Sequence, residues 1–118
     1  MPALNFKKQF APLIASGKKT QTIRLIRKHP IKKGDKLYLY TGLRTKHSQK
    51  IKEANCISVE PINIGCHTIT LANKVLSHSE QLLLAHADGF NNLADFRAFF
   101  EKAYSLPFDG VVIKWKEL

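Results

Sequence analysis

Acidic residues and cysteines are scarce in this 118-residue chain: nine Asp and Glu accompany nineteen Lys and Arg, and there are two cysteines. Cys56 and Cys66 stand ten residues apart with no CxxC pair. That spacing excludes a disulfide framework and is poor for a zinc site. We expect both to be free, largely buried thiols in a reducing cytoplasm.

The chain also lacks long apolar runs and the common cofactor motifs. No stretch approaches the roughly 20 apolar residues of a membrane span, and the N-terminus does not resemble a targeting peptide. None of the five histidines has a His or Cys three or four residues away, and neither a Walker loop nor a dinucleotide glycine fingerprint is present. We therefore expect a cytoplasmic protein without a membrane segment, metal or cofactor.

Positive charge is what the chain has in excess. The formal net charge is +10, and the Lys and Arg residues cluster in segments 18–36 and 44–52. Such asymmetry favours a polyanionic partner, with nucleic acid ahead of an anionic membrane. The alternative is a small basic protein whose charges are merely solvated.

The length and the 44% hydrophobic content fit one domain, residues 1–118, with a single core. Strand patterns occupy segments 3–6, 20–26, 37–41, 51–61, 66–71 and 111–116, with a hairpin connection at 63–65. Helical spacing occurs at 10–14, 77–87 and from 92 onward. Strands separated by turns, with one early and two later helices, predict an α+β domain built on a small mixed β-barrel with flanking helices. We expect a monomer.

Local signals fix several helix ends. Ser77 with Glu80 forms a capping-box pattern, and Asn92 repeats a start signal. Gly17 and Gly89 stand where a left-handed C-terminal cap is needed. The first helix is therefore expected to end just before a strongly polar stretch.

That stretch, residues 17–24, holds three cations, two hydroxyls and an amide around one large apolar side chain, Ile23. In a strand, Ile23 would enter the core while Thr20, Thr22 and Arg24 line the other face. We interpret the stretch as the floor of a polar, anion-accepting pocket. A guanidinium between apolar neighbours usually holds a planar anion, so Arg24 is expected to bind either a ligand or a carboxylate of the chain, that of Asp88 or Glu101.

Segment 42–50 is basic and has little apolar content, which predicts an exposed loop. Its charged residues are Arg44, Lys46, His47 and Lys50. They can contact phosphates without reading sequence, although a merely solvated loop remains the alternative.

Three motifs, in order along nearly the whole chain, resemble the ASCH-domain family of the PUA-like superfamily. They are Gly17-Lys18-Lys19-Thr20-Gln21-Thr22-Ile23-Arg24, similar to a Gly-x-Lys-Thr-x-x-x-Arg signature, Lys33-Gly34-Asp35 before an apolar strand, and Ala87-Asp88-Gly89-Phe90 before a helix. The resemblance implies a PUA-like β-barrel and a role connected with RNA. It implies that residues 1–118 are one ASCH domain.

A bacterial branch of that family hydrolyses the acetyl amide of N4-acetylcytidine with a lysine, a threonine and a glutamate. By position, the lysine corresponds to Lys19, the threonine to Thr22 and the acid to Asp88. This chain departs from the pattern, because Asp88 is one methylene shorter than glutamate and the segment after it needs a one-residue shift to align.

The favoured hypothesis is an RNA- or nucleotide-binding domain. The expected contacts are Lys18, Thr20, Arg24, Arg44, Lys46 and Lys50. The alternative is an amidohydrolase acting on N4-acetylcytidine-type nucleosides through Lys19, Thr22 and Asp88, or a ribonuclease. Residues three apart on a regular strand point to opposite faces, so the chain must bend before the strand if Lys19 and Thr22 are to meet.

Overall fold

The computed structural model describes residues 2–117, in which strands and helices form one α+β unit. In chain order the elements are β1 (Ala3–Phe6), the 3₁₀ turn η1 (Lys8–Phe10), α1 (Ala11–Ala15), β2 (Gln21–Arg24), β3 (Lys36–Thr41), β4 (Gln49–Ile64), β5 (Ile69–Leu71), β6 (Lys74–Val75), α2 (His78–Ala87), α3 (Leu93–Tyr104) and β7 (Phe108–Glu117). No helix in this range is long and apolar enough to cross a membrane.

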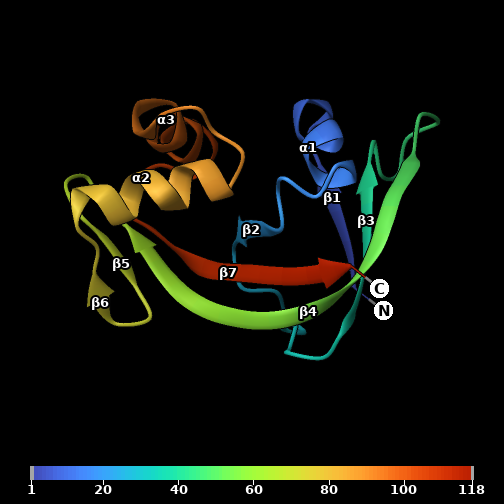
Figure 1. Cartoon of the computed structure of the whole chain (residues 1–118), viewed down its shortest axis with the longest axis horizontal. Helices are drawn as coiled ribbons and strands as arrows, with labels where there is room; N and C mark the ends of the chain where they lie inside the picture. Colours follow the sequence, from blue (N-terminus) through green and yellow to red (C-terminus); the bar gives the residue numbers. More distant parts are fainter. Residues whose placement is uncertain (1, 118) are drawn as a thin grey trace.

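The sheet is organised around β4, a 16-residue strand that sweeps beneath the molecule as an arc (Figure 1). Its first part pairs with β3, its last residues pair with β5, and β7 runs antiparallel along it from Ala54–Glu117 to Ile64–Phe108. The register shifts between Cys56 and Ser58, which leaves Ile57 as an extra residue on β4. Such a bulge bends a strand and increases its twist.

The sheet does not close into the predicted barrel. The two strands that would have to pair to close it are β1, which pairs in parallel with β3, and β2, which pairs with β7; no ladder joins β1 to β2 among the described residues. Side chains span the gap instead. Arg24 Nη2 donates to the backbone oxygen of Asn5, and Arg27 Nη2 lies 3.5 Å from that of Ala3. An open seam between β1 and β2 replaces the last ladder that a barrel requires.

The expected strand 20–26 is shorter in the structure, where β2 ends at Arg24. Leu25 and Ile26 are 52% and 64% exposed. At the end of β2 the Arg24 carbonyl oxygen lies so close to β7 that a Cβ on Gly110 would stand 2.3 Å from it. The strand can approach β7 this closely only because residue 110 has no side chain.

The predicted hairpin is displaced along the chain. β4 continues to Ile64, into the expected connection at 63–65, and the turn contains Cys66, which is exposed and not buried as expected. Cys56 is buried and both thiols are free, as predicted. The short strand β6 was not predicted, because a strand of two residues gives no periodic signal.

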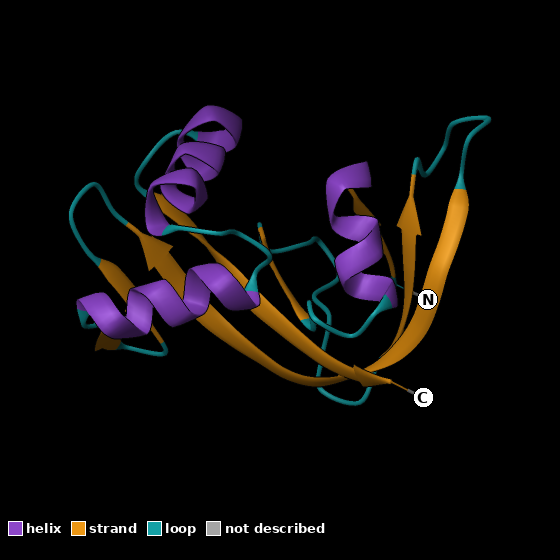
Figure 2. Ribbon diagram, turned by 45° about the horizontal axis from the view of Figure 1, so that its top comes forward, coloured by secondary structure: helices purple, strands orange, loops and turns teal. Residues whose placement is uncertain are grey.

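The helix signals are confirmed. Ser77 Oγ accepts from Glu80 N at 3.2 Å, and Glu80 Oε1 accepts from Ser77 N at 2.9 Å, which completes the capping box of α2. Asn92 Oδ1 accepts from Asp95 N at 2.7 Å and begins α3. Gly17 and Gly89 have φ of +82° and +97°. Both later helices lie on the same side of the sheet, above the end formed by β4 and β5 (Figure 2).

Aromatic side chains join α3 to the sheet. Phe100 lies 5.2 Å from Phe108 of β7 and 5.1 Å from Phe96, between ring centroids, and all three are buried. Edge-on and tilted ring pairs of this kind add about 0.5–1.5 kcal/mol each beyond their burial. Phe90 extends the cluster to Phe10 of η1, at 5.5 Å. The cluster fixes α3 opposite the open seam.

Candidate functional site

Lys19 is turned into the molecule just before β2 begins. Gly17, in its left-handed conformation, reverses the chain, and the Lys19 amide then donates to Leu13 O at 3.0 Å. The residue is 2% exposed. The bend that sequence reasoning required therefore exists, and Lys19 and Thr22 line the same cavity although they are three residues apart.

Lys19 is paired with Asp88, the residue that follows α2. Its Nζ donates to Asp88 Oδ1 at 3.1 Å and to the Asp88 backbone oxygen at 2.5 Å. The two side chains are 3% and 6% exposed. The ammonium also lies 4.9 Å from the centroid of the Phe10 ring, within the range of a cation–π contact. Asp88 thus holds Lys19 in one orientation with two acceptors.

Burial shifts both members of this pair toward their neutral forms. It lowers the pKa of Lys19, and the positive charge of Arg24 adds to that effect while Asp88 opposes it. Burial raises the pKa of Asp88 to about 6, against the lowering effects of Lys19, the Gln21 side chain and Arg24. Opposed shifts at adjacent groups are typical of acid–base pairs in active sites and also of buried structural ion pairs.

Gln21 is a further buried polar residue beside this pair. Its side chain lowers the pKa of Asp88, yet its Nε2 atom is buried and has no hydrogen-bond partner of normal geometry among the described residues. Gln21 is therefore close to the carboxylate but poorly aligned with it. The general composition of stretch 17–24 pointed to this residue, but its role was not predicted.

Arg24 is fixed by neutral groups. Its Nε donates to Thr22 Oγ1 at 3.1 Å, its Nη2 donates to Asn5 O, and its Cζ lies 4.7 Å from the centroid of the Phe6 ring. Of the two carboxylates expected as internal partners, neither Asp88 nor Glu101 is within ion-pair distance of it; among residues 2–117 its guanidinium forms no salt bridge.

A cavity of about 220 Å³ brings these groups together. It lies between α3 on one side and β1, η1 and β2 on the other, elements whose positions Figure 1 shows. Its lining residues are Asn5, Phe6, Lys7, Phe10, Lys19, Thr22, Ile23, Arg24, Asp88, Phe99, Phe100 and Tyr104. Its volume is below the roughly 300–1,000 Å³ of pockets for drug-sized ligands. All three residues predicted as catalytic share it.

Sequence reasoning missed the walls of this cavity. Phe99, Phe100 and Tyr104 come from α3, where aromatic residues recur at helical spacing, a pattern that equally fits a core helix. Asn5 and Phe6 lie on β1, whose sequence gives no sign of a site. Phe90, which is buried beside Phe10, Phe96 and Phe99, does not line the cavity.

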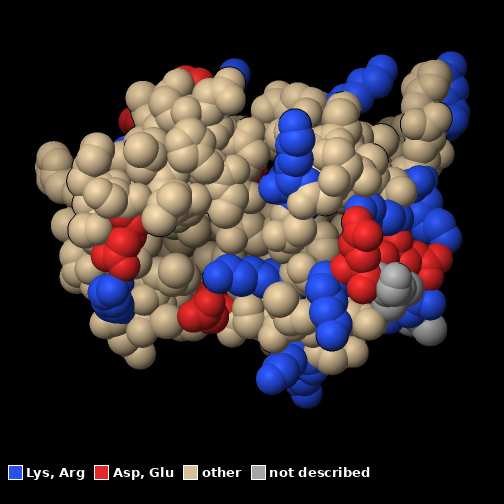
Figure 3. All heavy atoms as spheres, viewed as in Figure 1, with Lys and Arg blue, Asp and Glu red and all other residues tan. Residues whose placement is uncertain are grey.

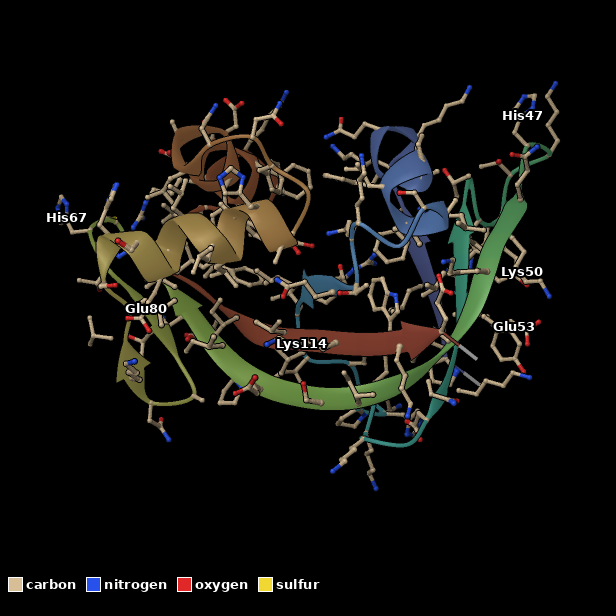
Figure 4. All side chains as sticks on the ribbon, viewed as in Figure 1. His47, Lys50, Glu53, His67, Glu80 and Lys114 are labelled. Atoms are coloured by element: carbon tan, nitrogen blue, oxygen red, sulfur yellow. The ribbon has the colours of Figure 1, made fainter. Side chains whose placement is uncertain are left out.

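The predicted nucleic-acid contacts do not form one surface with the cavity. Lys18 and Thr20 are exposed outside it, whereas Arg24 lies inside. Lys50, at the start of β4, points its ammonium to Glu53 Oε2 at 2.6 Å; Figure 4 shows the two beside the first part of β4, and neither lines the cavity.

Arg44, Lys46 and His47 belong to the β3–β4 loop, which is exposed as predicted. A second, more open hollow of about 650 Å³ lies at its base, lined by Lys8, Lys46 and His47 among others. Lys and Arg side chains project from this loop and above α1 in Figure 3. The described residues contain no group of three or more His, Cys, Asp or Glu side chains suited to a metal ion.

Neither protein-family models nor curated protein sequences match this chain.

Proposed function

We propose that the protein is an amidohydrolase acting on an N4-acylated cytidine. The observation that carries this proposal is that Lys19, Thr22 and Asp88 line one small cavity, with Lys19 Nζ held 3.1 Å from Asp88 Oδ1. The similarity of residues 17–24 to the ASCH signature supports it from the sequence side. We also propose that the protein is a PUA-like domain whose barrel is interrupted by the β1–β2 seam, and that it acts as a cytoplasmic monomer.

Lys19 is the proposed base. Its lowered pKa makes the neutral amine accessible. Its Nζ donates two hydrogen bonds to Asp88, one to the backbone oxygen and one to Oδ1. Thr22 is the proposed nucleophile. Its Oγ1 accepts a hydrogen bond from Arg24 Nε, which stabilises negative charge that develops on that oxygen.

The reaction balances as follows. Thr22 Oγ1 attacks the amide carbonyl carbon and its proton passes to Lys19; the C–N bond breaks as that proton passes to the exocyclic nitrogen. Lys19 then takes a proton from water as the water oxygen attacks the acyl-threonine, and that proton passes to Thr22 Oγ1, which releases the carboxylic acid and regenerates the hydroxyl. Asp88 orients Lys19 and stabilises its protonated form, the role that a carboxylate plays behind the base in other covalent hydrolases.

The cavity also suits the base of such a substrate. It is small, and the partly buried Phe99 and the exposed Tyr104 of α3 supply aromatic surface on one side. Stacking of a base on an aromatic side chain contributes about 1–3 kcal/mol. The acyl group would reach the polar floor formed by Lys19 and Thr22.

The test is release of cytidine from N4-acetylcytidine by the purified protein, followed by chromatography. We expect turnover to fall by a factor of at least about 100 in Lys19→Met and Thr22→Val. Lys18→Met is the matched control, because Lys18 is adjacent but exposed. Turnover that persists in both site variants, with melting curves showing that they fold, would remove these residues from the mechanism; no turnover by the unmodified protein would refute the proposal.

A second candidate, RNA binding, is favoured by a separate observation: the hollow at the base of the β3–β4 loop is lined by Lys8, Lys46 and His47. Affinity for short RNAs, measured across a salt series, tests it. Contacts to several phosphates require a steep fall in affinity as salt rises. Lys8→Gln with Lys46→Gln would reduce that slope by about two. Absence of binding at low salt would exclude this function.

A further inference from the structure

The cavity has more positive than negative charge. Lys7, Lys19 and Arg24 line it, and Asp88 is the one carboxylate among its lining residues. Asp88 is already paired with Lys19. The charge of Arg24 is therefore left without a neutralising group of the described chain.

That lack of a partner is energetically significant, because Arg24 is partly buried and burial lowers its pKa. A cation removed from water is costly unless an anion or a set of hydrogen bonds replaces its hydration. Thr22 Oγ1 and Asn5 O satisfy part of the guanidinium. Its Nη1 atom forms no hydrogen bond within residues 2–117, so one edge of the fork is available to a ligand.

The guanidinium is also held rigidly. The Phe6 ring supports its face at 4.7 Å, and the two hydrogen bonds fix its plane from β2 and β1. A fork held in this way loses little side-chain entropy when it binds an oxyanion. Lys7 adds a second, more exposed cation to the same cavity; its Nζ lies 5.0 Å from the centroid of the Phe99 ring.

We propose that Arg24 and Lys7 form an anion subsite that takes the phosphate attached to the cytidine, so that the ligand of this cavity is a nucleotide and not a neutral nucleoside. This inference rests on the proposed function for the identity of the base. The phosphate has two sources, the 5′-monophosphate of a free nucleotide or a phosphodiester within an RNA strand. Both present the same anionic oxygens to the guanidinium.

The experiment measures binding and does not depend on turnover. Titration calorimetry with the full chain compares cytidine, cytidine 5′-monophosphate and a short cytidine-containing RNA. A charge-assisted contact predicts that the monophosphate binds about tenfold more tightly than cytidine, or more, and that the preference weakens as salt rises. If the RNA binds about tenfold more tightly than cytidine and the monophosphate does not, the subsite accepts a phosphodiester.

Two substitutions, Arg24→Gln and Lys7→Gln, locate the subsite, and Arg27→Gln is their control. Arg24→Gln should bring the affinities for cytidine and its monophosphate within about twofold of each other. Arg27→Gln removes an exposed charge three residues away and should leave the preference for the monophosphate intact. Lys7 is exposed, so Lys7→Gln is expected to fold normally. A reduced preference for the monophosphate over cytidine in this variant supports the subsite even if Arg24→Gln does not fold.

The outcomes separate this inference from the proposed function. Equal affinity for cytidine and both phosphorylated ligands, or no binding of any of them, overturns the subsite. A phosphate preference without hydrolysis of N4-acetylcytidine upholds the subsite and refutes the amidohydrolase. Hydrolysis without a phosphate preference upholds the amidohydrolase and refutes the subsite.

Discussion

Lys19 and Asp88, 69 positions apart, meet in the interior, where Lys19 Nζ donates to both the carboxylate and the backbone oxygen of Asp88. The pair joins the chain before β2 to the end of α2. It is thus both the centre of the candidate site and a tie between the sheet and its helical cover.

Removing the carboxylate should destabilise the fold. Asp88→Asn leaves the buried Lys19 without a counter-charge, which typically costs about 3–5 kcal/mol. Urea denaturation measures the change in the free energy of unfolding. The double variant Lys19→Met/Asp88→Leu should regain most of the loss, since apolar replacement of a whole buried pair is often neutral. A double variant as unstable as Asp88→Asn would contradict this account.

The contribution of Asp88 to stability should be lost as pH rises from 3.8 through about 6. The folded-state pKa of Asp88 is about 6, above its ordinary 3.8, so in this window the folded state binds more protons than the unfolded state. The stabilising contribution of Asp88 is full below its unfolded pKa of 3.8 and is lost as the pH rises through about 6. We expect the slope of unfolding free energy against pH to become less negative in Asp88→Asn. Identical slopes would mean that Asp88 titrates normally.

Gly110→Ala should weaken the pairing of β2 with β7. The new Cβ would stand 2.3 Å from Arg24 O and 2.7 Å from the Phe108 ring, and overpacking of this kind costs about 1–3 kcal/mol or more. Gly34→Ala is the comparison, because it meets no atom within 4 Å and carries only the strain of its φ of +95°. Thermal unfolding should rank Gly110→Ala as the less stable variant; the opposite order would argue against the close approach.

Ser77→Ala should cost α2 about 1 kcal/mol, the usual value of an N-cap side chain. The hydroxyl accepts from Glu80 N, and the Glu80 carboxylate bonds back to Ser77 N, so the substitution removes one of two reciprocal bonds. Ser79→Ala, at an exposed position in the first turn, should be nearly neutral. Equal effects of the two substitutions in thermal unfolding would show that the cap does not stabilise the helix.

Features that depend on a few neighbouring residues were predictable from the sequence. The capping box at Ser77, the helix start at Asn92 and the left-handed glycines 17 and 89 all occur as expected. The exposed loop containing Arg44 and Lys46 also follows from local composition. Each of these is decided by hydrogen bonds or backbone conformations within one turn of chain.

Predictions that depend on how distant strands pair were wrong. The barrel that the strand pattern suggested is open between β1 and β2, and β4 extends into the residues expected to form a hairpin. Cys66 is exposed because the turn falls at that position and not two residues earlier. Strand ends depend on which partner each residue meets, and that information is not local.

For the candidate site, the sequence by itself determined the chemical content of residues 17–24 and required a bend before the strand if Lys19 and Thr22 were to act together. The tertiary structure decided the rest. It placed Lys19 against Asp88, left Arg24 without a carboxylate and walled the cavity with α3. The reason is physical: burial and charge pairing depend on elements that are distant in sequence, so the same residues could have been a solvated strand or the floor of a cavity until the fold assigned their neighbours.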